Sequence, residues 1–155
     1  MGSNMYVHVE VRDSSQRLPN WNYVPGDFYD GRNSTIFALL AGVRNHEGIQ
    51  PLAAPRGLPE DATNEVKRIY YAEADLQDPE DQVTTWFTLA ELEEKVDWER
   101  FIGVWHESDF SVRTMAKLRK LYEHNSEVRI IVWFDDTLAD LEPIEGRSYS
   151  FTPRG

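Results

Sequence analysis

The residues with the clearest capacity for chemistry are three arginines that sit beside asparagine or glycine. Arg32 and Arg44 are followed by Asn33 and Asn45, and Arg56 precedes a glycine. A guanidinium offers a planar fork of donors that matches phosphate and carboxylate oxygens, and the free amides at a helix start favour the same ligands. These five residues therefore predict either an anion or nucleotide pocket or structural ion pairs with the chain's own carboxylates.

A second set of residues has the types that bind hard metals or carry protons. His8 and Glu10 share one side of an alternating pattern, and Asp135 and Asp136 follow a β-rich run. Imidazole and carboxylates suit both tasks. An H-x-E spacing is not a defined metal motif, and an ordinary exposed strand face explains it equally. We therefore assign no catalytic residue, no metal site and no cofactor, and keep these four residues only as weak candidates.

Familiar enzyme signatures are absent from the sequence. It has no P-loop, G-x-G-x-x-G, G-x-S-x-G or kinase pattern. It also has no cysteine, so a disulfide, a thiolate nucleophile and a Cys-ligated zinc are excluded. A familiar enzyme class is therefore disfavoured, while enzymatic activity is left open.

Negative charge is concentrated in one segment. The net charge is -11, and residues 60–99 hold thirteen acids against three bases, a local net charge of -10. Such a segment is either a solvated helical face or a docking surface for a basic protein, and it argues against direct binding to nucleic acid or to membranes. The acidic residues assigned to the candidate docking surface are Glu60, Asp61, Glu73, Asp75, Asp78, Glu80, Asp81, Glu93 and Glu94.

Three segments are predicted to be strands. Apolar and polar residues alternate from Met5 to Arg12, which is typical of a half-buried strand. Residues Val128 to Phe134 are β-rich with apolar side chains at both parities, as in a central strand covered on both faces. Arg147 to Thr152 is predicted as a final edge strand.

Four segments are predicted to be helices. The first, Thr35 to Val43, is apolar almost all round and should be buried on more than one side. The second runs from Thr63 to Ala74. A capping box of Thr88 and Glu91 predicts a third helix over Leu89 to Val96. A fourth helix is predicted from Ser108 or Asp109 to His124, with Val112, Met115, Leu118, Leu121 and Tyr122 on its apolar side and Arg113, Lys117 and Lys120 on a basic side.

Together these elements predict one α+β domain over residues 1–155, a small mixed or antiparallel sheet with three to four helices packed on it. Residues 13–27, 48–57 and 75–82 are predicted as loops from their Gly, Pro, Asn and acidic residues. The chain has no apolar run long enough to cross a bilayer and no signal-peptide pattern at its start, so we expect a cytoplasmic protein.

Several sequence blocks resemble a family of small, mostly uncharacterised bacteriophage and prophage proteins that typically begin MGCDIH. The blocks are YDGRN with FALLAGVRN, PRGLPED, WFTLAEL and VRIIVWFDD, and together they span most of the chain. The chain departs from the family at its start, MGSNMY, where Ser3, Asn4 and Tyr6 replace cysteine, aspartate and histidine. It also has Val83, Thr84 and Thr85 where the family tends to have histidines.

The resemblance and the acidic segment lead to three functional hypotheses. The first is a phage or prophage accessory protein that inhibits a basic, nucleic-acid-binding component of host defence in the host cytoplasm, as anti-CRISPR proteins and DNA mimics do. The second is a small-molecule binder that sequesters a phosphate-containing signalling nucleotide through Arg32, Arg44 and Arg56. The third, and least favoured, is a metal-dependent hydrolase.

Overall fold

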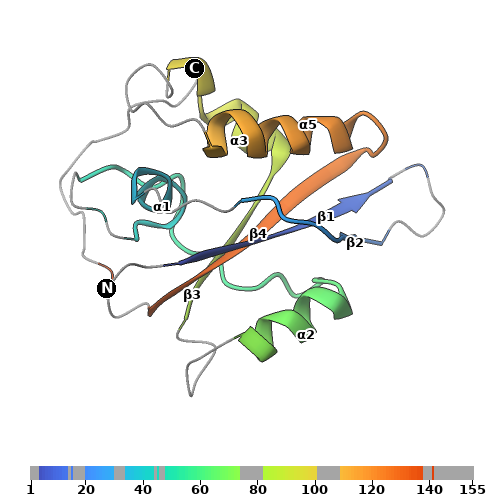
Figure 1. The fold of residues 1–155 in the computed structure, drawn as a ribbon, viewed down its shortest axis with the longest axis horizontal. Helices are drawn as coiled ribbons and strands as arrows, with labels where there is room; N and C mark the ends of the chain where they lie inside the picture. The colour runs from blue at the N-terminus through green and yellow to red at the C-terminus, as the bar shows by residue number, and fades with distance from the viewer. Residues whose placement is uncertain are drawn as a thin grey trace.

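A computed structural model describes residues 4–13, 15, 20–29, 34–43, 45, 48–73, 82–100, 109–137 and 141. Within these residues the chain forms a four-stranded antiparallel sheet in the order β2-β1-β4-β3, with helices on both faces (Figure 1). This confirms the predicted α+β fold. The strands are β1 (Met5–Arg12), β2 (Asn22–Val24), β3 (Gln82–Thr88) and β4 (Glu127–Thr137).

The two central strands are those that the sequence pattern predicted. In β1 the valines face one side of the sheet, whereas Tyr6, His8 and Glu10 face the other. Strand β4 is buried on both faces from Val128 to Phe134, in agreement with its apolar residues at both parities. It extends three residues beyond the predicted run, to Thr137.

Two strands were not predicted. Strand β3 begins at Gln82, the last residue of a predicted loop, and its first four residues, Gln82 to Thr85, are all buried, so no alternation of apolar and polar residues marks it in the sequence. Strand β2 lies inside the segment predicted as a loop, and its three residues are too few to give a periodic pattern. The predicted strand at Arg147 to Thr152 lies outside the described residues.

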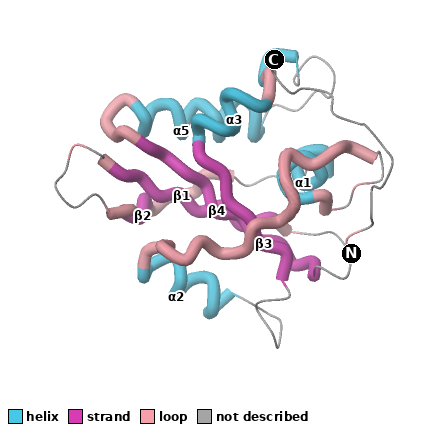
Figure 2. The backbone as a smooth tube through the Cα atoms, turned by 180° about the vertical axis from the view of Figure 1, so that it is seen from behind, coloured by secondary structure: helices cyan, strands magenta, loops and turns pink. Residues whose placement is uncertain are grey.

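The helices cover the two faces of the sheet unequally, as Figures 1 and 2 show from opposite sides. The helices of one face pack on the sheet around the larger hydrophobic core. Val9, Ile130 and Leu40 belong to this core and are fully buried. On the other face, one helix of the described residues packs through Val66 and Tyr70 against the sheet. The first group comprises α1 (Ser34–Ala41), α3 (Leu89–Lys95) and α5 (Met115–Tyr122) with the π-helix η2 (Asp109–Thr114) before it, and the helix on the other face is α2 (Asn64–Glu73).

Local signals predicted three helices well. Residues 35–41 of α1 are all buried, as the apolar composition implied. Helix α2 begins and ends within one residue of the prediction. In α3 the Thr88 hydroxyl accepts from the Glu91 amide while the Glu91 side chain accepts from the Thr88 amide, which confirms the capping box.

The fourth predicted helix differs from expectation at its start. Its first six residues form the π-helix η2 and only Met115–Tyr122 is α-helical. A π turn adds a residue to each turn, so the apolar spacing of an α-helix does not apply there. Val112, which lies in η2 and was predicted on the apolar side, is 48% exposed, whereas Phe110 is buried. In α5, Met115 and Leu118 are buried as predicted, but Tyr122 at the end of the helix is 54% exposed.

The two edges of the sheet differ. The outer edge of β3 is partly covered by Arg56 and Gly57: the Gly57 amide donates to the Thr84 carbonyl at 2.8 Å, and the Arg56 guanidinium donates to the Trp86 carbonyl at 2.9 Å. The outer edge of β2 has no backbone partner among the described residues. Within the same part of the chain, no helix is both long and apolar enough to cross a membrane.

Candidate functional site

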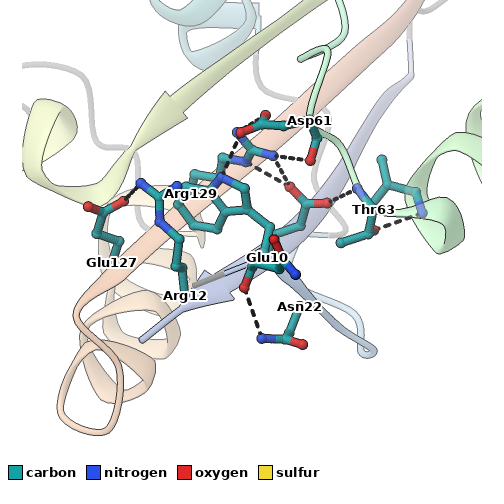
Figure 3. A network of polar contacts seen from close by, with 10 residues as sticks. Glu10, Arg12, Asn22, Asp61, Thr63, Glu127 and Arg129 are labelled. Carbon is teal, nitrogen blue, oxygen red and sulfur yellow. Dashed lines mark hydrogen bonds and ion pairs between the residues drawn. The ribbon is translucent and has the colours of Figure 1, made fainter. Parts of the chain in front are cut away.

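A buried ion pair joins the two central strands on the face that α2 covers. Glu10 of β1 and Arg129 of β4 are directly opposed in the sheet. The Arg129 Nε and Nη2 atoms donate to Glu10 Oε1 at 2.7 and 2.6 Å, and both side chains are buried (Figure 3). Because an isolated buried charge is very costly, burial of either side chain depends on the presence of the other.

The ion pair also anchors the turn that leads into α2. The second oxygen of Glu10 accepts the Thr63 amide at 2.7 Å, and Arg129 Nη1 donates to Asp61 Oδ1 at 2.9 Å (Figure 3). The Thr63 hydroxyl in turn accepts the Val66 amide, as an N-cap residue does. The start of α2 is thereby fixed to the sheet by charged hydrogen bonds.

Trp21 completes this polar network. The guanidinium groups of Arg12 and Arg129 lie 4.4 and 4.1 Å from the centre of the Trp21 ring. The Trp21 indole nitrogen donates a hydrogen bond to Asp61 Oδ2 at 3.2 Å. Burial opposes ionisation of Asp61, but the hydrogen bonds from Arg129 and Trp21 outweigh it and lower the pKa of that carboxyl. Arg12 is itself paired with Glu127. The cations of the network are therefore balanced by carboxylates of the chain.

An open, polar pocket of about 450 Å³ adjoins the network. It lies between the segment that enters β2 and the first turn of α2. Asp61 and Thr63 contribute to its wall, and the Glu65 carboxylate at its rim is exposed and has no ion-pair partner among the described residues. The other residues that line it include Arg12, Asn20, Trp21, Asn22 and Asn64.

The described members of the predicted anion site have partners within the chain. Arg56 makes two hydrogen bonds to the Glu91 carboxylate, of 2.8 and 2.6 Å. These hydrogen bonds, chiefly, lower the pKa of Glu91 to about 2 and raise that of Arg56. The Asn45 side chain bonds both backbone groups of Ile49 and so closes its own loop. Arg56 therefore forms an ion pair with a carboxylate of the chain, which is the second of the two alternatives for these residues. Arg32, Asn33 and Arg44 lie outside the described residues.

The weak metal or acid-base candidates are dispersed. His8 stacks on Trp133 with ring centres 4.5 Å apart, and burial lowers its pKa. Glu10 belongs to the ion pair, and the Asp135 carboxylate accepts from the Asn4 amide at 2.8 Å. Asp136 is half-buried at the end of the same strand. Within the described ranges no three histidine or carboxylate side chains gather as a metal site would require.

The described members of the predicted acidic surface fall on two sides of the molecule. Glu60 and Asp61 precede α2 on one face of the sheet, whereas Glu93 and Glu94 belong to α3 on the other. Glu93 is paired with Arg119. Asp75, Asp78, Glu80 and Asp81 lie outside the described residues, as does the side chain of Glu73.

Comparison of the chain with protein-family models, curated proteins and solved structures found no match. The resemblance to phage and prophage proteins therefore stays a prediction.

Sequence reasoning missed the centre of this site. Arg129 was treated only as part of a β-rich run, and Trp21 only as a loop aromatic. A usable signal was present in the sequence. Arg129 is the lone charged residue in the apolar run Val128 to Phe134, which is covered on both faces, and a buried arginine needs a carboxylate partner. Glu10, the one acid in the predicted half-buried strand Met5 to Arg12, was the available partner.

Proposed function

We propose that this protein acts by binding, and that the acidic surface at the start of α2 engages a basic protein that itself binds nucleic acid. The observation that carries the proposal is the pair Glu60 and Glu65. Both are exposed and neither has an ion-pair partner among the described residues. In a chain of net charge -11, such unpaired carboxylates attract a basic surface and speed its association.

The other charges of the site support a binding role over a catalytic one. Glu10 and Arg129 neutralise each other in the interior, and Glu91 is held by Arg56. Such groups fix the shape of the surface and leave Glu60 and Glu65 to meet a partner. The resemblance to phage and prophage proteins makes a nucleic-acid-binding component of host defence the partner class to test first.

Charge reversal on either side of the sheet tests the proposal. One variant carries Glu60→Lys and Glu65→Lys, and a matched control carries Glu94→Lys and Glu99→Lys, which are also exposed and change the net charge equally. Each protein is used to capture partners from nuclease-treated bacterial lysate. We expect the native chain and the control to recover the same basic, nucleic-acid-binding proteins, and the first variant to bind them at least about tenfold more weakly.

Binding of each recovered protein is then measured with purified components at low and moderate salt. An electrostatic interface weakens as salt rises. Recovery of no basic protein by the native chain, or equal loss in both variants, would contradict the proposal. Circular dichroism of all three proteins verifies that the substitutions leave the fold intact.

A further inference from the structure

We propose that the open edge of β2 and the pocket beside it bind an extended, basic segment of the partner by strand addition. This inference rests on the proposed function, because it takes the partner to be basic. It adds the place and the mode of contact: main-chain hydrogen bonds to Asn22–Val24, and a lysine or arginine side chain in the pocket.

The first argument is the difference between the two sheet edges. Arg56 and Gly57 make hydrogen bonds to the β3 edge, whereas the described part of the chain provides no backbone partner for the outer edge of β2. An unpaired edge presents N–H and C=O groups that an extended peptide can satisfy. One edge of this sheet is therefore partly covered and the other is available.

The second argument is the position of the pocket. Asn20, Trp21 and Asn22 form its wall on the β2 side, and Asn64 and Glu65 form its wall on the α2 side. Asn22 belongs both to β2 and to the pocket lining, so a strand paired with β2 would come near this opening. Because side chains alternate across a strand, every second side chain of the added segment would face the same side of the sheet as α2.

The third argument is the charge of the pocket. Its arginine, Arg12, is paired with Glu127, and Asp61 is shared with Arg129. Glu65 is the charge of the lining that has no ion-pair partner in the described part of the chain, and the asparagine amides add donors and acceptors that suit a peptide. The lining therefore complements a cationic side chain.

The length of β2 limits what can bind there. The strand has three residues and Pro25 follows it directly, so the edge cannot be extended in that direction. So short an edge offers few main-chain hydrogen bonds, and it therefore favours a peptide that is also held by a side chain in the pocket.

The test uses a capped hexapeptide of alternating arginine and valine with the native protein. Two control peptides have the same charge, one N-methylated at every valine and the other at every arginine. Strand addition uses the N–H groups of alternate residues only, so N-methylation of one set must weaken binding. Binding is followed by amide chemical shifts in NMR spectra.

We expect the parent peptide to shift the amides of Asn22–Val24 and of the first turn of α2, and at least one methylated peptide to bind about tenfold more weakly. Glu65→Gln should weaken binding about threefold or more, whereas the control Glu94→Gln should not. Equal binding by all three peptides, or shifts confined to other residues, would overturn the proposal. Dimerisation through β2 in sedimentation runs, with no shift on adding peptide, would also overturn it.

The two proposals can fail separately. If basic proteins are captured as expected but the peptide leaves β2 unperturbed, the proposed function stands and strand addition is wrong. If the peptide binds at β2 while Glu60→Lys with Glu65→Lys captures the same proteins as the native chain, the acidic-surface proposal is wrong and the edge site stands.

Discussion

At the scale of single residues, Arg129 has the most demanding environment in the described structure. It is 3% exposed, is paired with a fully buried Glu10, and lies against the ring of Trp21. A buried pair of this kind adds little net stability over apolar residues, because desolvation offsets the attraction. Removing one member is different, since it leaves the other charge buried alone.

We therefore predict that Arg129→Leu lowers the free energy of unfolding by about 3–5 kcal/mol, because Glu10 loses its cation. The double variant Glu10→Leu with Arg129→Leu should recover much of that loss. Urea unfolding followed by circular dichroism measures both. A double variant as unstable as the sum of its two single variants would show that the pair is not acting as a unit.

At the scale of elements, the segment around Arg56 and Gly57 covers part of the β3 edge without forming a strand. It bonds to β3 through a few hydrogen bonds, and its path depends on Gly57, whose φ of +79° lies in the left-handed region. A Cβ at this position would meet no atom within 4 Å. The cost of a side chain at Gly57 is therefore a backbone cost alone.

Gly57→Ala should accordingly destabilise the protein by about 1–2 kcal/mol, whereas Gly57→Asn should cost less, because asparagine tolerates left-handed backbone. Thermal and urea unfolding of the three proteins make the comparison. If alanine is as stable as glycine there, the covering segment does not need this conformation.

The sequence predicted elements whose signals are local. The alternation of β1, the apolar surround of α1 and the capping box at Thr88 each lie within about ten residues, and each is confirmed. Strand β3 depends on pairing with β4 about 45 residues away, and its buried run has no period of its own. The candidate site is harder still, since Glu10 and Arg129 are separated by 119 residues.

At the scale of the whole molecule, the sheet lies between two helical layers of unequal size. Strand β4 lies at its centre, paired on both sides and packed on both faces. Strand β2 is paired on one side only and its residues are partly exposed. Local stability should therefore fall from the centre of the sheet toward β2.

Hydrogen exchange provides the measurement. We predict that amides of Ile130 to Phe134 exchange most slowly among the strands, at the rate of global unfolding, and that amides of Asn22–Val24 exchange fastest. Uniform protection across β1, β2 and β4 would mean that β2 opens only with the rest of the sheet, and would make its edge a rigid platform.

The Glu10–Arg129 pair also restricts how the central strands can align while the chain folds. A shift of two residues preserves which side chains face each core, so the apolar pattern alone does not reject it. In one direction the shift would place Glu10 opposite Ile131, and in the other opposite Glu127, carboxylate against carboxylate. Both misalignments leave a buried charge uncompensated, so the ion pair selects one alignment among several that hydrophobic burial would accept.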